Sequence, residues 1–565
     1  MNRIRIKGAR FYTHLSYLHH IGKTPLKYTT LGKQLELTSS RFPEREAVIA
    51  FQENRRITYH DLLSQADRFA AGLHQIGVNY GDRVGIWAPN ILEWNILCFA
   101  CARAGFVAVF INPNYIAQEL EYCINKVGMK VIICPEMCDK LHFYDTLGTV
   151  VSNLRQQKPE NLNNPSTQSL KNIITVSENS LGGTFNYNEI LHLANETSIK
   201  KIKSNQDCVR PDDAVNIQFT SGTTGKPKAA MVSHYNLVNN AFFIGQRNEL
   251  ETKHHKICVQ VPFFHAFGCT ITIGAAISHG ATMVVPSPRY NPLQNLKAIK
   301  EENCTIIHGT PTMYVDLVNV QSQYNENISP EIAVSGGALC SPELFKKMKK
   351  HLNVNKVKSV YGLTETTACV FQTMPSDDEE KMLNTVGHVC DHLEVKLVDE
   401  NNKVVPLGTP GELCVRGYTT MLGYWEDREK TDEMIDNHHW LKTGDQFILR
   451  KDGYGKIVGR LKDMIIRGGE NIFPKEIEDF LNAHPAVLDA HVIGLPHERL
   501  GEEVCACIKL RDGAELTLEA LTEFCKESLA KFKIPTQLRI VDEFPKTQSG
   551  KIQKFVLKKQ YESVK

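Results

Sequence analysis

The sequence predicts an α/β protein with a large N-terminal domain of stacked α/β sheets, a small β-rich subdomain within it, and a small α+β domain at the C-terminus. Two changes in pattern lead to this prediction. From Pro43 to Val284 short apolar strands alternate with segments of helical spacing, and after Gly387 short strands and turns take over. Strand–helix alternation favours parallel sheets covered by helices, so we expect such sheets in the first region.

The alternating region can be divided into elements by its apolar residues. Strands are expected at Ala47–Phe51, Arg83–Ala88 and Val107–Asn112, and helices over Thr58–Ile76 and from near Asn90. In the Thr58–Ile76 segment, Leu62, Phe69 and Leu73 share one face, as in a helix packed on a core. The segment Lys158–Ser169 is rich in Asn, Pro, Gln and Ser and indicates a surface loop.

The later elements are shorter and end in a separate C-terminal unit. Pro474–Asn482 has proline at its first position, which is typical of a helix start. The other expected elements are strands at Glu394–Val398, Gly411–Val415, Val487–Gly494 and Glu503–Leu510, and a helix over Thr517–Phe532.

Composition excludes several classes of protein. The chain has 565 residues with 42% hydrophobic and 23% charged residues, which is ordinary for a globular enzyme. A net charge of +2 argues against a nucleic-acid binder. No apolar segment is long enough to span a membrane, and the best candidate, Ile96–Ile111, contains Arg103 in its middle. The 16 cysteines do not form a disulfide framework in so long a chain, so we expect buried thiols and a reducing compartment.

The N-terminal arm, residues 1–27, is basic and free of acidic residues. Its cations are Arg3, Arg5, Lys7, Arg10, Lys23 and Lys27. Such a composition is typical of a mitochondrial transit peptide and equally of a disordered basic arm. The C-terminal Glu-Ser-Val-Lys is not a peroxisomal address.

The stretch Phe219–Lys228 reads FTSGTTGKPK and follows an apolar strand. Glycines let successive N–H groups converge, and hydroxyls and ammonium groups add donors, so this loop suits a polyphosphate. It lacks the spacing of the common GxxxxGK[ST] loop. A simple Gly/Thr turn with solvated lysines is the alternative interpretation. The proposed cradle consists of Thr220, Ser221, Gly222, Thr223, Thr224, Gly225, Lys226 and Lys228.

Further motifs follow this loop along the chain. They are PFFHAFG (262–268), SGGALC (335–340), YGLTET (361–366), GELCVRGYTTMLGYW (411–425), TGD (443–445), GRLKDMIIRGGENI (459–472) and PKTQSGKIQK (545–554). In this order, from about Tyr28 to the C-terminus, they resemble the signature motifs of the adenylate-forming superfamily of acyl-CoA synthetases, luciferases and peptide-synthetase adenylation domains. Phrases such as VNIQFTSGTTG, GTPTMYVD and VGRLKDMIIRGGENI are similar to its mitochondrial medium-chain acyl-CoA ligase group.

The resemblance implies a domain organisation and a reaction. It divides the chain into an AMP-binding domain at 28–459, a hinge at 460–464 and a mobile C-terminal domain at 465–565. The implied reaction joins a fatty acid to CoA at the expense of ATP, through an acyl-AMP intermediate and release of pyrophosphate. Mitochondrial location in the matrix is expected, with the cytoplasm as the alternative.

The resemblance also implies the nucleotide site. Glu365 would hold Mg²⁺, Thr364 would face the α-phosphate, and Tyr361 with Gly362 would lie near the adenine. Asp445 would bind both ribose hydroxyls, and Arg460 would reach the ribose or α-phosphate. Without the family, Thr364–Glu365 could equally be a helix cap and Asp445 a turn residue. The backbone at Gly336, Gly337 and Ala338 would lie against the adenine and close the acyl pocket.

His265 would lie at the acyl carboxylate, although a lone histidine among aromatics is often only a packed core residue. No aspartate follows it to bind an amino group, so a simple carboxylic acid is expected. The acyl pocket is expected to be lined by Phe242, Phe243, Met313, Val315 and Phe371, which suits an alkyl chain.

Lys551 would stabilise the charge that develops on the α-phosphate during the first half-reaction. The alternative is an ordinary member of a basic tail, but the Ser549–Gly550 turn singles it out. Lys462 occupies the hinge position, and Gly468 and Gly469 would let the pantetheine arm of CoA pass once the C-terminal domain rotates.

Other functions remain open. An aryl-acid or luciferin-type adenylating enzyme would use the same motifs with another pocket, and a catalytically silent acyl- or nucleotide-binding homologue would have lost the reaction. A peptide-synthetase domain is not expected, because the chain stops soon after Lys551 without a carrier-protein domain.

Overall fold

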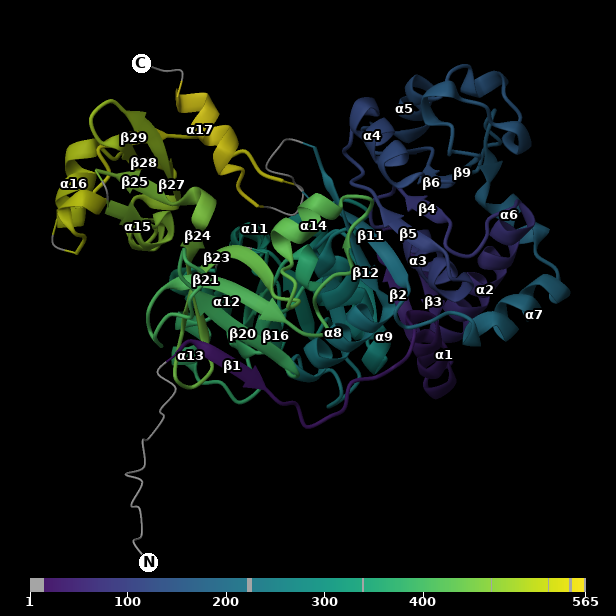
Figure 1. Ribbon diagram of the computed structural model, residues 1–565, viewed down its shortest axis with the longest axis horizontal. Helices are drawn as coiled ribbons and strands as arrows, with labels where there is room; N and C mark the ends of the chain where they lie inside the picture. Colours follow the sequence, from purple (N-terminus) through teal and green to yellow (C-terminus); the bar gives the residue numbers. More distant parts are fainter. Residues whose placement is uncertain are drawn as a thin grey trace, which may run out of the picture.

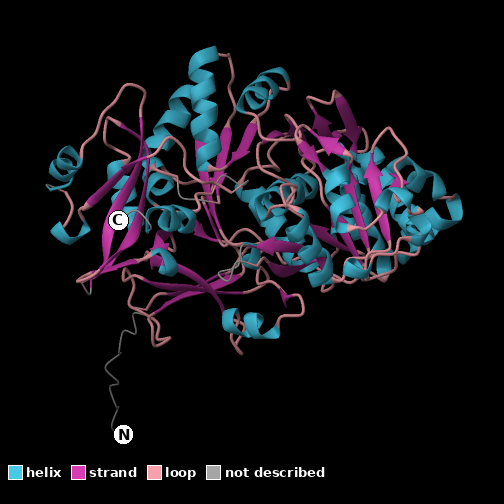
Figure 2. Ribbon diagram, turned by 90° about the horizontal axis from the view of Figure 1, so that it is seen from above, coloured by secondary structure: helices cyan, strands magenta, loops and turns pink. Residues whose placement is uncertain are grey.

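The computed structural model in Figure 1 describes residues 15–220, 226–337, 340–468, 470–526, 528–547 and 551–562. Two large mixed sheets and a smaller antiparallel sheet form the N-terminal part, and a further sheet forms the C-terminal part. Helices lie on both sides of the strands (Figure 2). The expected α/β fold with a small β-rich subdomain and an α+β C-terminal domain is confirmed.

The first large sheet has eight strands, and its centre is parallel. Helices α2 (Tyr59–Gln75) and α3 (Leu92–Ala104) pack on one face, and α4 (Ala117–Val127) and α5 (Phe143–Val150) pack on the other. Two short helices, α6 (Tyr187–Leu193) and α7 (Glu196–Ser204), follow at its edge. In order across the sheet the strands are β10 (Phe185–Asn186), β9 (Asn172–Val176), β6 (Val131–Pro135), β4 (Arg83–Ile86), β5 (Val107–Phe110), β11 (Ala214–Thr220), β12 (Lys228–Ser233) and β22 (Gly423–Tyr424).

The second large sheet has nine strands and shares a core with the first. Helices α10 (Pro292–Glu301), α11 (Pro311–Tyr324) and α12 (Pro342–Leu352) pack on one face. The other face meets α8 (His234–Arg247), a π-helix (Phe267–Gly274) and α9 (Ala275–His279), which form one apolar cluster with α1 (Leu31–Arg41), α2 and α3. The strands are β19 (His388–Val389), β18 (Phe371–Gln372), β17 (Lys356–Tyr361), β16 (Ile332–Gly336), β15 (Ile306–Gly309), β13 (Lys256–Val259), β14 (Thr282–Val285), β2 (Glu46–Ala50) and β3 (Arg55–Thr58).

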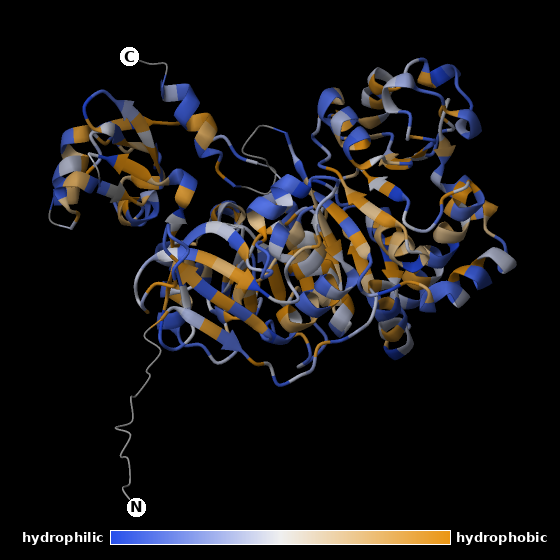
Figure 3. Cartoon of the chain, viewed as in Figure 1, coloured by the Kyte–Doolittle hydropathy of each residue, from blue (hydrophilic) through white to orange (hydrophobic). Residues whose placement is uncertain are grey.

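The alternation of apolar strands with amphipathic helices along the chain explains these layers. The parallel strands are buried on both faces, as their nearly continuous apolar sequences require. Figure 3 shows the same distribution, with hydrophobic residues along the strands and hydrophilic residues on the outer helices. Strands expected at Ala47–Phe51, Arg83–Ala88 and Val107–Asn112 are confirmed as β2, β4 and β5.

The antiparallel sheet contains a strand from the expected N-terminal arm. Its order is β1 (Tyr17–His20), β20 (Leu393–Val398), β21 (Gly411–Arg416), β23 (Leu441–Leu449) and β24 (Gly455–Arg460). Tyr17 lies opposite Lys396 in the register of β1 and β20, and the Lys27 N–H donates to Asn239 Oδ1 at 2.7 Å. Residues 15–27 are therefore part of the fold, and the expected boundary after residue 27 lies too late in the chain.

The C-terminal domain surrounds its own apolar core. Its sheet has the order β26 (Glu470–Ile472), β25 (Ile465–Arg467), β28 (Gly501–Leu510) and β27 (Val487–His497), and β29 (Gln537–Ile540) pairs with β28. Helices α15 (Pro474–Leu481), α16 (Leu518–Lys526) and α17 (Lys554–Glu562) pack around it. The expected helix Thr517–Phe532 is too long, because α16 ends at Lys526 and a 3₁₀ turn forms at Lys531–Lys533.

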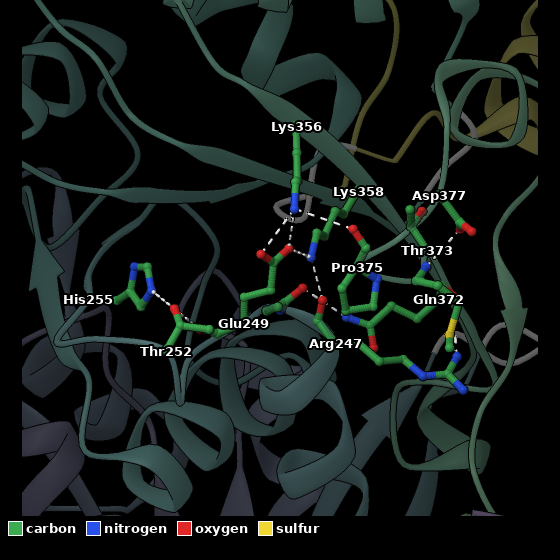
Figure 4. A network of polar contacts seen from close by, with 12 residues as sticks. Arg247, Glu249, Thr252, His255, Lys356, Lys358, Gln372, Thr373, Pro375 and Asp377 are labelled. Carbon is green, nitrogen blue, oxygen red and sulfur yellow. Dashed lines mark hydrogen bonds and ion pairs between the residues drawn. The ribbon is translucent and has the colours of Figure 1, made fainter.

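A buried ionic cluster contacts two lysines of strand β17 (Figure 4). Lys358 is 0% exposed, and its Nζ lies 2.6 Å from Glu249 Oε1 just after α8. Lys356 on the same strand lies 2.8 Å from the same oxygen. Lys358 also donates to the Arg247 carbonyl oxygen. These contacts tie the end of α8 to the strand that carries Tyr361 at its C-terminal end.

All sixteen cysteines are free thiols, and Cys98, Cys101, Cys505 and Cys507 are buried, as expected. Along the described ranges, no helix combines the length and apolar character that a membrane span requires.

Candidate active site

A cleft of about 630 Å³ lies where the N-terminal part meets the C-terminal domain. The C-terminal ends of parallel strands β16 and β17 open into it, which is the usual place for a ligand in an open α/β sheet. Expected site residues that line it are Gly337, Tyr361, Gly362, Asp445, Arg460 and Lys551.

Asp445 is held by groups from two sheets. It is 4% exposed, and its carboxylate accepts a hydrogen bond from the Tyr361 hydroxyl at 2.7 Å. Arg460, its neighbour in the register of β23 and β24, places Nε 3.2 Å from Asp445 Oδ1. Burial raises the pKa of Asp445, and Arg460 and Tyr361 oppose this rise. The result is a fixed acceptor at the wall of the cleft, suited to a pair of hydroxyl groups.

Glu365 lies in the 3₁₀ turn η6 (Thr364–Thr366) directly after β17. Its Oε1 accepts hydrogen bonds from the Tyr424 hydroxyl at 2.8 Å and from Thr220 Oγ1 at 3.3 Å. The end of strand β11, the 3₁₀ turn and strand β22 therefore meet at this carboxylate. Thr364, the first residue of the turn, is half-buried beside it.

The ends of the proposed phosphate cradle are adjacent. Thr220 and Lys228 are Cα partners in the antiparallel pair β11–β12. Lys228 Nζ lies 4.9 Å from the centre of the Tyr424 ring, and Lys226 Nζ lies 5.5 Å from the centre of the Tyr122 ring. The residues Ser221, Gly222, Thr223, Thr224 and Gly225 lie outside the described part of the chain.

Lys551 comes from the C-terminal domain and reaches this site. A Cβ atom on Gly337 would lie 3.4 Å from Lys551 Cε. Burial and then the Arg460 guanidinium lower the pKa of Lys551 to about 8, and the Asp445 and Glu365 carboxylates oppose this effect. The ammonium group thus lies within electrostatic range of both carboxylates.

His265 lies just before the π-helix, an irregular element that is often found at functional sites. Its Nδ1 accepts a hydrogen bond from the Phe267 N–H at 3.2 Å, so the neutral ring carries its proton on Nε2. Burial and then Lys551 lower the pKa of His265 to about 3. A neutral ring beside Lys551 can donate one hydrogen bond from Nε2.

The glycines of the site allow close backbone packing. A Cβ at Gly336 would lie 2.5 Å from Val360 Cγ2, and one at Gly362 would overlap the Ala368 carbonyl oxygen. Gly337 has φ +82°, a conformation that favours glycine. Ala338 lies outside the described residues.

The expected hinge is a short connection between β24 and β25. Lys462 lies in the 3₁₀ turn η7 (Leu461–Asp463), and it is among the cations that lower the pKa of Lys551. Gly468 has φ +60° and donates its N–H to the Leu500 carbonyl oxygen at 2.7 Å. Gly469 lies outside the described part of the chain.

The expected lining of the acyl pocket overlaps little with the lining of this cleft. Only Val315 of the five expected residues lines the cleft. Phe371 stacks on Phe447, and the centroids of these two rings are 5.5 Å apart. Phe242 stacks on His279. Phe371, Phe243 and Met313 belong to one apolar cluster, and Phe242 packs against it.

Tyr424 is a site residue that the sequence analysis missed. Its hydroxyl donates to Glu365 and its ring faces Lys228, so it connects the carboxylate to the start of β12. It is the next-to-last residue of the motif GELCVRGYTTMLGYW, but nothing in that motif indicates which of its aromatic residues faces the site.

A magnesium ion fits this donor set only together with a nucleotide. Among the residues that the structure describes, no group of three or more His, Cys, Asp or Glu side chains could hold a metal. Mg²⁺ is usually held by one or two carboxylates, water and substrate phosphates. Glu365, beside Thr220 at the start of the proposed phosphate cradle, would satisfy that pattern.

Comparisons with known proteins agree with this geometry. The model of the AMP-binding enzyme family matches residues 35–425, and that of the AMP-binding enzyme C-terminal domain matches residues 476–551. The chain is 39% identical over 553 residues to the mitochondrial medium-chain acyl-CoA ligase ACSF2 of Danio rerio, covering 97% of this chain and 91% of that protein. It is 37% identical over 535 residues to the putative acyl-CoA synthetase YngI of Bacillus subtilis, covering 94% and 97%.

Solved structures show the same fold. The anthranilate CoA ligase AuaEII in complex with anthranoyl-AMP superposes with a TM-score of 0.82 at 25% identity, covering 95% of this chain and 98% of that one. ATP-bound MatB from Rhodopseudomonas palustris gives a TM-score of 0.80 at 25% identity, covering 94% and 99%. The chain belongs to the AMP-binding enzyme family, the adenylate-forming superfamily, and within it to the AMP-forming acyl-CoA synthetases.

Proposed function

We propose that this protein is a fatty acyl-CoA ligase that acts on medium-chain acids with ATP and CoA as co-substrates. The observation that carries the proposal is that Lys551 and Asp445, from separate parts of the chain, line one cleft. Glu365, from a third part of the chain, lies within electrostatic range of Lys551. The medium-chain preference is supported by relatives that are named medium-chain acyl-CoA ligases and are 39% identical over nearly the whole chain.

In the first half-reaction a carboxylate oxygen of the acid attacks the α-phosphorus of ATP, and pyrophosphate leaves. Asp445 holds the ribose hydroxyls, and the backbone at Gly336–Gly337 lies along the adenine. His265 donates from Nε2 to the carboxylate of the acid and orients it. Glu365 would hold a Mg²⁺ ion, which supplies positive charge to the phosphates when bound.

The Lys551 ammonium stabilises the negative charge that develops around the α-phosphorus. A donor placed where charge develops contributes about 3–4 kcal/mol in a site that excludes water. Thr364, next to Glu365 in the 3₁₀ turn, contributes a hydroxyl donor. Thr220, Lys226 and Lys228 hold the departing pyrophosphate.

In the second half-reaction the CoA thiolate attacks the acyl carbon, a thioester forms, and AMP leaves with the electrons of the acyl–oxygen bond. We propose that the C-terminal domain, residues 465–565, rotates about residues 460–464 around Lys462 between the two steps. Lys551 then leaves the cleft, and the turn at Gly468–Gly469 lines the path of the pantetheine arm. Reuse of one domain shields the reactive anhydride from water in both steps.

The test is carboxylate-dependent pyrophosphate release with acids from acetate to palmitate and with benzoate and anthranilate, each with and without CoA. We expect release to peak at medium-chain acids, to yield AMP and to rise when CoA is present. Release with aromatic acids alone would keep the reaction and change the substrate. Absence of release with every acid would overturn the proposal in favour of a silent acyl- or nucleotide-binding protein.

We also propose import into the mitochondrial matrix. The support is the acid-free, basic N-terminal sequence and the mitochondrial designation of the relatives. Since residues 15–27 are part of the fold, removal of a transit peptide would have to occur before Leu15. Mass spectrometry of the N-terminus of protein from isolated mitochondria tests this, and a full-length cytoplasmic protein would contradict it.

A further inference from the structure

Lys551 lies in the connection between β29 and α17. Hydrogen bonds join the residues shortly before Lys551 to Lys551 and the residues that follow it. The Lys551 N–H donates to Thr547 Oγ1 at 3.1 Å, and the Thr547 N–H donates to the Lys551 carbonyl oxygen at 2.8 Å. The Gln553 N–H donates to the Pro545 carbonyl oxygen at 2.8 Å. Lys546 and Ile552 form an isolated antiparallel β-bridge. These bonds shape the connection, but they do not attach it to the rest of the C-terminal domain.

Apolar packing of Phe544 and Ile552 attaches the connection to the domain. A buried ionic attachment is added by Lys554, the first residue of α17. Its Nζ lies 2.5 Å from Glu478 Oε1 on α15, and the carboxylate is 9% exposed. The same oxygen accepts the Val492 N–H of β27 at 2.8 Å. Glu478 thus joins three elements of the domain at a point three residues from Lys551.

The surroundings of Glu478 favour its charged form. Burial alone would raise the pKa of Glu478, but Lys554 and then His491 outweigh this and lower it. His491 Nδ1 lies 3.8 Å from Glu478 Oε1, and its Nε2 lies 3.3 Å from Asp489 Oδ2. The side chains of Glu478, Asp489, His491 and Lys554 all line the cleft near Lys551.

Helix stability does not explain a lysine at this position. A cation in the first turn opposes the helix dipole, and α17 has no acidic residue in its first turn. One turn later, Lys558 Nζ lies 2.7 Å from Glu502 Oε1 on β28, so the helix has a second attachment to the sheet. The pair Lys554–Glu478 is more buried than the pair Lys558–Glu502, and it lies closer to Lys551 along the chain.

We propose that Glu478 is a positioning residue for the first half-reaction: through Lys554 it fixes the connection that carries Lys551, so that the ammonium group projects between Asp445 and Glu365. This rests on the proposed function. The second half-reaction does not use Lys551 in the cleft, so it should not depend on the pair Glu478–Lys554.

The test measures the two half-reactions separately. Acyl-AMP formation is followed in a single turnover with decanoate and ATP, and thioester formation is followed from synthetic decanoyl-AMP and CoA. Glu478→Gln and Lys554→Gln should each slow acyl-AMP formation about 10- to 100-fold, because a displacement of about 1 Å has effects of this size. Both should leave thioester formation within about twofold of wild type, well below the effect of such a displacement. Lys558→Gln, on the same helix, is the matched control and should leave both rates unchanged.

A second arm excludes general damage to the fold. In a Lys551→Ala background, Glu478→Gln should cause no further loss of acyl-AMP formation, because its effect acts through the missing ammonium group. An additional loss in that background, an equal slowing of both half-reactions, or an unchanged first half-reaction would each overturn the inference. If wild-type protein forms no acyl-AMP with any acid, the proposed function fails instead.

Discussion

The Tyr361 hydroxyl donates a hydrogen bond to Asp445 at 2.7 Å and joins the nine-stranded sheet to the antiparallel sheet. Its ring packs edge-on against Phe447, with centroids 4.6 Å apart. The contact fixes a buried carboxylate at the edge of the cleft before any nucleotide arrives. Two sheets from different parts of the chain thereby contribute one preformed acceptor.

Tyr361→Phe should therefore weaken nucleotide binding more than it slows the chemical step. A buried acceptor that loses a donor costs about 1–3 kcal/mol, so we expect the KM for ATP to rise about tenfold with little change in kcat. Steady-state kinetics with ATP as the varied substrate measure this. Tyr454→Phe removes a similar buried bond to Asp377 outside the nucleotide site and should leave the KM unchanged. Equal KM values for wild type and Tyr361→Phe would contradict the assigned role.

The pH dependence of adenylation should report Lys551. Its pKa is lowered to about 8, so the ammonium form predominates below this pH and is lost above it. The kcat/KM for ATP should therefore fall as the pH rises through about 8. In Lys551→Arg the guanidinium stays charged, and this decline should disappear from the accessible range. An unchanged decline in that variant would show that another group titrates. Lys551→Ala should slow acyl-AMP formation about 100- to 1000-fold.

Tyr424 should set the magnesium requirement through its bond to Glu365. Loss of an ordinary hydrogen bond costs about 1 kcal/mol, so Tyr424→Phe should raise the Mg²⁺ concentration for half-maximal adenylation about fivefold. Tyr17→Phe removes a hydroxyl–carboxylate bond to Glu394 on the surface and serves as the control. The same Mg²⁺ dependence in Tyr424→Phe and wild type would separate Glu365 from the metal.

The ionic cluster in Figure 4 should control stability and not catalysis. Glu249→Gln leaves the fully buried Lys358 without its carboxylate partner, and breaking a buried pair costs about 3–5 kcal/mol. We expect a clear loss of stability in urea. Lys253→Gln breaks an exposed pair with Glu331 and should change stability by less than about 1 kcal/mol. The double variant Glu249→Gln with Lys358→Met should recover part of the loss. Equal stability of Glu249→Gln and wild type would show that the cluster does not hold β17.

The sequence predicted the fold well where local pattern and burial agree. The apolar segments of β2, β4 and β5 and the amphipathic α2 appear within a few residues of their expected bounds, because they are buried on faces that their periodicity defines. The sequence-based prediction was less accurate for elements whose position depends on tertiary contacts. β1 has little apolar character, and its place depends on the free edge of β20.

The same distinction holds for the site. Motifs placed Tyr361, Asp445, Arg460 and Lys551 around one cleft, although their separation along the chain gives no distance. Tyr424 and Glu478 were missed because each acts through a partner, Glu365 or Lys554, whose proximity only the fold creates.

The most direct measurement of the central claim is mass spectrometry of a reaction containing enzyme, ATP, Mg²⁺ and decanoate, first without CoA and then after CoA is added. We predict that decanoyl-AMP and pyrophosphate appear together before CoA, and that decanoyl-CoA and AMP replace the acyl-AMP after it. Formation of ADP, or of decanoyl-CoA without an acyl-AMP that precedes it, would contradict the account.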